Sequence, residues 1–163
     1  MKGIRVYGYV LDRLPKNNST FAIFFEPIFP TLKKYHWLYL EQPFSYDEDE
    51  TGDCGKAIEG IPANDGYIAP NTLLPKFARF VCGNWNNLFG FESMPDAPLI
   101  FSRLISCDGV FLEKAIDLCF FNVDAAYWDF YAKDEELLQV VTKHASSLAG
   151  VQVEQVEFSD FEF

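Results

Sequence analysis

A chain of 163 residues with 49% hydrophobic and 17% aromatic residues can bury one sizeable core and is too short for two ordinary domains. Its net charge of −11 excludes direct binding of DNA or RNA, because such a field repels phosphate backbones. No apolar run reaches the length of a membrane span or of a signal-peptide core, so we expect a single cytoplasmic domain over 1–163 with no membrane contact.

The first forty residues contain two predicted strands and one short helix. Side chains alternate in character over 1–11, with Arg5 and Tyr7 on one side, and this period of two predicts a strand. Helix-capping residues precede 21–25 and prolines follow it, which favours a short helix there. Aromatic residues recur at alternate positions over 35–41, and this pattern predicts the second strand.

The middle of the chain is less regular. An acidic segment without apolar residues predicts an exposed loop over 46–55, and a turn signal marks 61–70 as irregular. A cap and a helical spacing predict a helix over 71–82. The segments 85–91 and 98–106 are predicted to be extended.

The last third of the chain has the clearest pattern. Two strands are predicted over 118–123 and 126–132, and their short connection predicts an antiparallel hairpin. A helix begins after Asp134, carries acids in its first turn and ends at Gly150. A further strand is expected over 151–158.

The order of these elements indicates the fold class. Short strands and short helices follow one another without a repeated strand-helix-strand unit. We therefore predict a single α+β domain with a mostly antiparallel sheet and a few short helices packed on one face.

Charge is distributed unevenly along the chain. Residues 1–107 hold 12 acids and 10 bases, whereas residues 108–163 hold 12 acids and 3 bases. A field of this kind attracts a basic protein partner, although it can also serve solubility alone. The sequence predicts neither a cofactor nor an oligomeric state.

Motifs for nucleotides, metals and nucleophiles are weak or missing. The sequence has no Gly-rich phosphate loop, and its two histidines, His36 and His144, lie in no metal-binding pattern. Its four cysteines are separated by 28, 25 and 12 positions, which fits neither a zinc site nor a disulfide framework. Cys54 is the one candidate nucleophile, and the acids over 47–53 disfavour its thiolate form. We therefore predict no catalytic residue and no metal site.

A stripe in the predicted strand over 126–132 is a candidate partner-binding surface. Alternation places Tyr127, Asp129 and Tyr131 on one side, opposite a set of core-like residues. Tyrosine beside a carboxylate is typical of contact surfaces that bind Lys or Arg. The alternative is that the tyrosines pack under the following helix while Asp129 is tied to a neighbouring amide.

The C-terminal segment is a second candidate surface. Acids alternate there with phenylalanines, so the tail over 159–163 either packs on one side or remains mobile. The acids that we assign to charge pairing are Glu154, Glu157, Asp160 and Glu162.

One resemblance covers about the last fifty residues. The Tyr-Trp-Asp-Phe-Tyr segment over 127–131, the helix start at Lys133 and Asp134, and the Val-rich strand over 151–158 resemble the C-terminal ends of small acidic bacterial proteins. Some proteins of that kind are immunity proteins of polymorphic toxins. The resemblance implies a cytoplasmic protein that blocks a cognate basic toxin, often a nuclease, and it implies no catalytic residue.

Three functions are therefore open at the level of sequence, of which the third, a structural subunit of a larger assembly, predicts a broad apolar patch in place of an acidic one. The first is a non-catalytic protein-binding domain, in which Asp129 and the tail acids pair with charge while Tyr127 and Tyr131 are anchors. The alternative is a small hydrolase or carbohydrate-processing enzyme with a cleft lined by Tyr35, Trp37 and Tyr39, and with carboxylates as acid and base.

Overall fold

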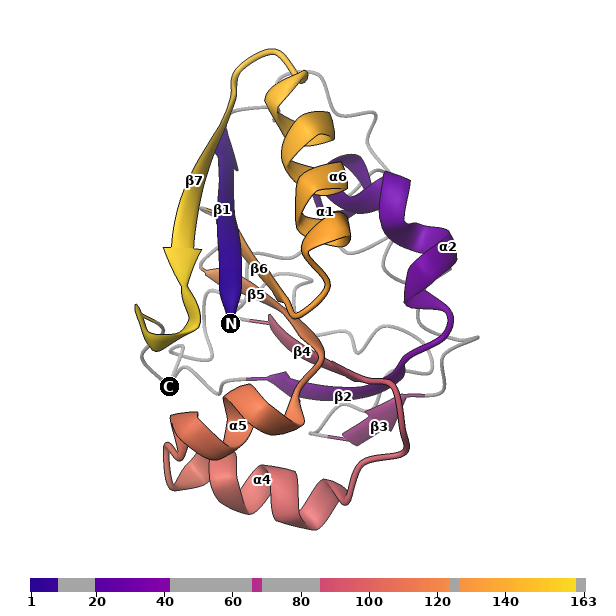
Figure 1. The fold of residues 1–163 in the computed structure, drawn as a ribbon, viewed down its shortest axis with the longest axis vertical. Coiled ribbons are helices and arrows are strands. Elements are labelled where there is room, and N and C mark those ends of the chain that lie inside the picture. The colour runs from indigo at the N-terminus through magenta and orange to yellow at the C-terminus, as the bar shows by residue number, and fades with distance from the viewer. Residues whose placement is uncertain (9–19, 42–65, 69–85, 124–126, 161–163) are drawn as a thin grey trace, which may run out of the picture.

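The computed structural model describes residues 1–8, 20–41, 66–68, 86–123 and 127–160. These residues form a seven-stranded sheet in the order β3-β2-β4-β5-β6-β1-β7, in which all neighbouring strands are antiparallel (Figure 1). The strands are β1 (Lys2–Gly8), β2 (His36–Glu41), β3 (Gly66–Ile68), β4 (Asn86–Phe91), β5 (Leu118–Val123), β6 (Tyr127–Ala132) and β7 (Val151–Glu157). The helices are α1 (Thr20–Phe25), η2 (Glu26–Ile28), α2 (Phe29–Leu32), α4 (Ala97–Ile105), α5 (Gly109–Ala115), α6 (Glu135–Ser146) and η3 (Phe158–Asp160).

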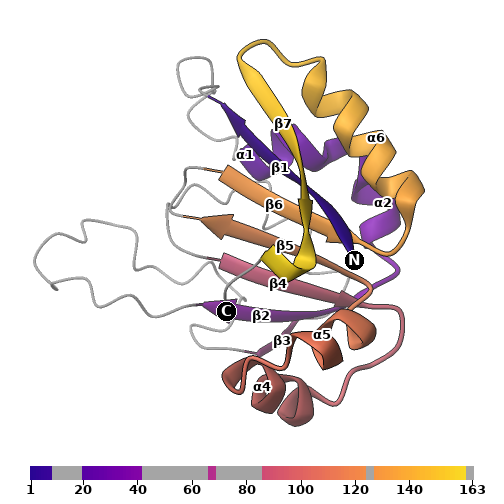
Figure 2. The same cartoon turned by 60° about the vertical axis from the view of Figure 1, so that its left-hand side comes forward.

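The first strand of the chain lies between two strands from its C-terminal third. Figure 2 shows β1 between β6 and β7, and Arg5 is opposite Asp129 on one side and Glu154 on the other. The hairpin of β5 and β6 therefore does not continue directly into β7. The sheet is continuous from β6 to β7 only when β1 lies between them. Its assembly therefore depends on contacts between distant parts of the sequence.

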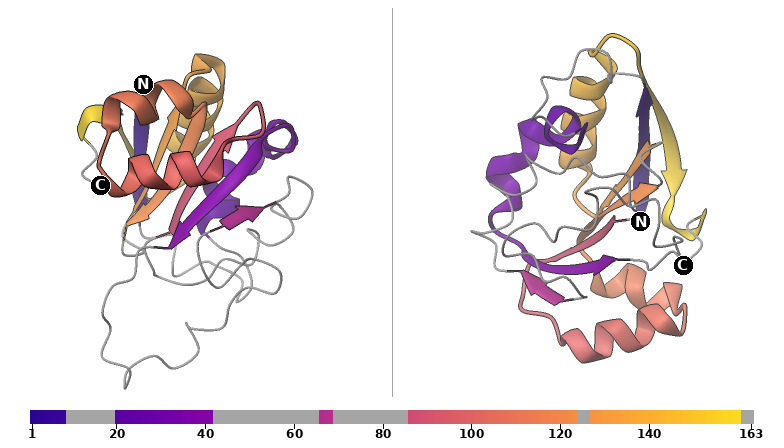
Figure 3. Two further views of the ribbon diagram at one scale, coloured as in Figure 1. Left: turned by 90° about the horizontal axis from the view of Figure 1, so that it is seen from below. Right: turned by 180° about the vertical axis from the view of Figure 1, so that it is seen from behind.

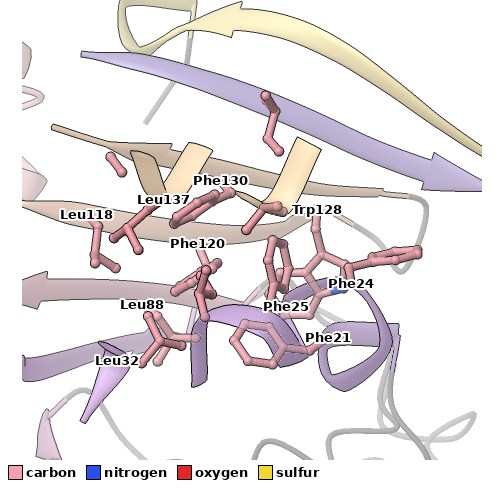
Figure 4. Close-up of a cluster of buried hydrophobic side chains, with 14 of the residues drawn as sticks. Phe21, Phe24, Phe25, Leu32, Leu88, Leu118, Phe120, Trp128, Phe130 and Leu137 are labelled. Carbon is pink, nitrogen blue, oxygen red and sulfur yellow. The ribbon is translucent and has the colours of Figure 1, made fainter. Parts of the chain in front are cut away.

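One face of the sheet packs against α1, α2 and α6 through aromatic rings (Figure 4). Phe120 stacks on Phe130 with ring centroids 4.7 Å apart, and Phe25 meets Phe120 edge-on at 4.8 Å. Buried rings of this size contribute large apolar areas, and their pairing adds about 0.5–1.5 kcal/mol beyond the area term. Trp37 joins this core, and its indole N–H donates to the backbone oxygen of Leu32 at 3.2 Å.

The other face packs against α4 and α5 (Figure 3). Leu38, Phe89 and Phe121 project from the sheet toward Ile100 and Leu104 of α4, in one buried cluster that also includes part of α5. Since both faces are covered, β5 is buried at every position. This explains why its sequence, LCFFNV, is apolar except for the buried Asn122 and does not alternate between polar and apolar residues.

The segment over 98–106 is the clearest error of the sequence analysis, because it is helical and not extended. Asp96 caps α4 by accepting a hydrogen bond from the backbone N–H of Leu99 at 3.1 Å, and Pro98 lies in the first turn, where its missing N–H has no cost. Ile100 and Leu104, four residues apart, are the buried positions of the helix.

The predicted α+β class and antiparallel sheet are confirmed, with one difference in the placement of helices. We expected helices on one face, but α1, α2 and α6 cover one face while α4 and α5 cover the other. The segment over 61–70, expected to be irregular, contains β3. The loop over 46–55 and the helix over 71–82 lie outside the described residues. Within the described ranges, every helix is too short or too polar to cross a membrane.

A tight turn joins α4 to α5. The backbone N–H of Asp108 donates to the carbonyl of Arg103 at 3.0 Å, and that of Cys107 donates to Leu104 at 3.1 Å. This pair of hydrogen bonds is the Schellman motif, which requires a left-handed residue directly after the helix. Cys107 occupies that position with φ of 54°. Asp108 then caps α5 by accepting from the N–H of Phe111 at 3.1 Å.

We predict that Cys107→Gly stabilises the protein. A side chain in the left-handed region costs about 1–2 kcal/mol, and the added freedom of glycine in the unfolded chain offsets part of this, so the expected gain is about 0.5–1 kcal/mol. Urea unfolding of the reduced protein measures the difference. Cys107→Ala removes the thiol and keeps the Cβ, so it is the matched control and should show no gain.

A second prediction concerns Gly3, which leaves room for the ring of Tyr131. A Cβ at Gly3 would lie 2.3 Å from Cδ1 of that ring and 2.9 Å from the backbone oxygen of Phe130. We expect Gly3→Ala to destabilise the protein by about 1–3 kcal/mol, as overpacking does. The control is Gly109→Ala, where a Cβ would meet nothing within 4 Å. Equal unfolding free energies for the two variants would contradict this prediction.

Candidate binding surface

The predicted stripe on β6 is mostly buried. Asp129 and Tyr131 are each 1% exposed, and only Tyr127 is half-buried. The stripe projects from the face of the sheet that carries α4 and α5. Asp129 and Tyr131 therefore offer no exposed surface to a partner, and of the three only Tyr127 keeps one. This is a correction to the hot-spot interpretation of the stripe.

Asp129 forms a bidentate ion pair with Arg5, its neighbour across the sheet. Nε of Arg5 donates to Oδ1 of Asp129 and Nη2 donates to Oδ2, both at 2.8 Å. These hydrogen bonds raise the pKa of the Arg5 guanidinium above its ordinary value, so Arg5 stays charged. The same guanidinium lies 4.1 Å from the ring centroid of Tyr127, a cation-π contact. The carboxylate is thus tied to a guanidinium, and not to an amide as the alternative interpretation expected.

Tyr131 is a core residue of the α4 and α5 side. Its ring meets Phe121 at 5.8 Å and Phe158 at 5.4 Å, both edge-on, and its hydroxyl donates to Oδ2 of Asp129 at 3.4 Å. Burial raises the pKa of the Tyr131 phenol well above its usual range. It therefore packs against neighbouring strands and η3, and not under α6, which lies on the opposite face.

An exposed part of this network continues onto β1 and β7. Tyr7 is opposite Tyr127 in the β1–β6 register, and its hydroxyl donates to Oε1 of Glu154 at 2.5 Å. That hydrogen bond raises the pKa of Tyr7. Tyr7 and Tyr127 are half-buried and Glu154 is exposed. We name these three residues, with Arg5 beside them, the tyrosine–glutamate surface.

The structure brings together some of the predicted residues and separates others. Tyr127, Asp129 and Glu154 lie on one side of the sheet, while Glu157 is exposed on the other side, opposite Lys2. Asp160 belongs to η3, and Glu162 lies outside the described residues.

The start of the C-terminal tail is attached to the sheet. Phe158 is buried against Tyr131, and its backbone N–H donates to the carbonyl of Met1 at 2.9 Å. Ser159 is exposed in η3, and 161–163 lie outside the described residues, so the alternatives for the whole tail over 159–163 remain predictions.

Arg5 and Tyr7 were not predicted from the sequence as members of the surface. Both lie on the same side of β1, as the alternation over 1–11 indicated. The pattern carried no information on which strand would lie beside β1, because pairing between distant strands leaves no mark in a single sequence.

The residues proposed for an enzyme cleft have another role. Tyr35, Trp37 and Tyr39 are all buried in the core beneath α1, α2 and α6, so they do not line a cleft. His144 Nε2 makes a hydrogen bond of 2.8 Å with the backbone oxygen of Ile23, and Cys54 lies outside the described residues. In the part of the chain that the structure describes, no three His, Cys, Asp or Glu side chains are grouped as a metal site would require.

A groove of about 350 Å³ lies between α6 and the strands β1 and β7. It is lined by Lys2, Glu135, Leu138, Gln139, Thr142, Lys143 and Gln155. Lys2 and Glu135 form an ion pair of 3.0 Å at its wall, and both side chains are largely exposed. The groove is thus a polar, solvated surface at the β7 edge of the sheet, the strand that also carries Glu154.

Comparisons of this chain with protein-family models, with curated proteins and with solved structures found no match. The chemistry of the surface is therefore the starting point for its function. That surface consists of two half-buried tyrosines, which contact the Arg5 guanidinium and the exposed carboxylate of Glu154.

We predict that Asp129→Asn destabilises the protein by about 2–3 kcal/mol, because Arg5 loses its charged partner in a largely buried site. Chemical unfolding measures this free energy. The control is Glu135→Gln, which removes an ion pair whose two side chains are 63% and 64% exposed and should leave the stability unchanged within error.

A double variant tests whether the loss of stability comes from leaving Arg5 without its charged partner or from the loss of the ion pair itself. Arg5→Met with Asp129→Leu replaces the pair by apolar side chains and should recover most of the loss, since well-packed apolar groups can substitute for a buried ion pair. An Asp129→Asn protein as stable as the Glu135→Gln protein would show that the pair contributes nothing.

Proposed function

We propose that this chain is a non-catalytic protein-binding domain whose partner is a basic protein, and that it acts as an immunity protein against a cognate toxin. The observation that carries the proposal is the tyrosine–glutamate surface, in which the half-buried Tyr127 contacts the ion-paired Arg5 and the half-buried Tyr7 is hydrogen-bonded to the exposed Glu154.

Rigidity of the surface supports a role in binding. Tyr127 is fixed by its contact with the Arg5 guanidinium, and Tyr7 is fixed by its hydrogen bond to Glu154. Side chains that are already ordered lose little conformational entropy when a partner binds, so more of the contact energy becomes affinity. Tyrosine is also among the residues that contribute most to binding when they are truncated.

The charge of the chain favours a cationic partner. Residues 108–163 hold 12 acids against 3 bases, and Glu135, Glu136, Glu154 and Glu157 are exposed on α6 and β7. Acids concentrated in this way speed the encounter with a basic protein and disfavour acidic ones. A nuclease must be basic where it holds phosphate, so an acidic inhibitor can occupy the same groove. The immunity role and its cytoplasmic location are those that the resemblance of the last fifty residues implies.

The test is capture of partners from a lysate of the source organism, followed by measurements on the purified pair. We expect one basic protein in stoichiometric amount. Tyr127→Ala should weaken its binding about tenfold or more, as loss of an interface anchor does. Glu154→Lys together with Glu157→Lys should slow association and reduce its dependence on salt.

The matched control is Glu92→Lys together with Glu26→Lys, two exposed acids outside α6 and β7, which makes the same change in net charge. The control should alter the association rate less than the pair on β7 does. If the β7 double variant and the control double variant affected binding equally, the interaction would depend on net charge alone and not on the β7 acids. Capture of no basic protein, or full affinity in the Tyr127→Ala variant, would refute the proposed function.

A further inference from the structure

Strand β7 ends the sheet. It pairs with β1 in an unbroken antiparallel register of seven residues, from Lys2 opposite Glu157 to Gly8 opposite Val151. No strand among the described residues lies along its other edge. A regular strand at the end of a sheet presents N–H and C=O groups along that edge, and these groups can bind a further strand.

The sequence of β7 contains few of the features that usually block an edge. Its residues are VQVEQVE, with no proline, glycine or lysine, and its register with β1 has no bulge. Proline, lysine and bulges are the devices by which edge strands avoid pairing with other chains. The only charged residues of β7 are Glu154 and Glu157, and both are exposed.

These two acids select the chemistry of a strand that pairs with β7. Glu154, a member of the tyrosine–glutamate surface, lies on the side of Arg5, and Glu157 lies on the side of Lys2. They are three residues apart, so their carboxylates project from opposite faces of the edge. A neighbouring strand with two basic residues three positions apart would place one positive charge opposite each carboxylate, and β-branched residues would then face Val153 and Val156.

We infer that β7 binds an extended basic segment of the partner protein as an added antiparallel strand. Its pattern, in order opposite residues 157 to 153, is basic, β-branched, polar, basic, β-branched. The inference rests on the proposed function for the existence of a natural partner, and it adds how that partner is held. Backbone hydrogen bonds supply affinity, and the two carboxylates set the register and exclude acidic strands.

A second copy of this chain is a poorer occupant of the edge. Each copy carries a net charge of −11, so two copies repel each other as they approach. Pairing of two β7 strands would also bring the acids of both copies together. A cationic strand would instead neutralise the acids of the one β7 that it pairs with.

The test uses a fluorescent peptide of sequence Lys-Val-Thr-Lys-Val-Thr-Val with blocked ends as the probe. Two matched peptides carry N-methyl groups on their odd or on their even residues, which keeps every side chain and charge but blocks one edge of the peptide backbone. We expect the plain peptide to bind, one methylated peptide to lose about tenfold or more in affinity, and the other to bind nearly as well. Amide signals of β7 should shift in NMR spectra of the complex.

Protein variants provide the second arm of the test. Glu154→Lys with Glu157→Lys should weaken peptide binding about tenfold, and Glu92→Lys with Glu26→Lys should weaken it much less. Equal binding of all three peptides, or no binding of the plain peptide, would overturn the inference. Dimerisation of the protein without peptide, seen by sedimentation and abolished by the β7 variants, would assign the edge to a second copy and would also overturn it.

The two proposals can fail separately. If a basic protein is captured and both Tyr127→Ala and the β7 variants weaken its binding, but the plain peptide does not bind, the edge inference is wrong and the proposed function stands. If the peptides behave as expected and no basic partner exists, the edge accepts strands but the proposed function is wrong.

Discussion

The bidentate ion pair between Arg5 and Asp129 joins two residues that are 124 positions apart in the chain. It lies where β1 pairs with β6, and the tyrosine–glutamate surface is assembled around it. The guanidinium holds Tyr127 on one side, while Glu154, on the other side of Arg5, holds Tyr7. Asp129 is almost completely buried, and burial of its charge would carry a large free-energy cost without the ion pair to Arg5. The surface therefore forms only when β1 pairs correctly with β6 and β7.

The rest of the domain supplies a rigid platform for this network. Aromatic rings from β5, β6 and α1 interlock on one face, and α4 and α5 close part of the other. A sheet that is packed on both faces resists bending, because any bend would open voids in two cores at once. Strand β7 is different, since among the described residues it pairs with one strand only and carries exposed acids. The packed core and the surface that we propose for binding thus lie in different parts of the same sheet.

Local patterns predicted much of the fold. The strands β1, β2, β4, β5, β6 and β7 and the helices α1 and α6 follow from alternation, helical spacing and caps that lie within a few residues of one another. The helix α4 was not predicted, because 98–106 was expected to be extended, whereas behind an Asp96 cap a proline favours the first turn of a helix. The helix α5 also depends on a cap, at Asp108, whose position is set by the turn at Cys107.

The sequence by itself determined the fold class, most of the strands and the acidic character of the C-terminal third, because these depend on composition and on neighbours along the chain. Only the tertiary structure decided which members of the Tyr-Asp-Tyr stripe are exposed. Asp129 and Tyr131 have the same alternation as Tyr127, but Arg5 and Phe158 cover them from other strands and turns. Burial depends on which distant segments pack together, and a period of two residues separates the faces of a strand without showing which face is covered.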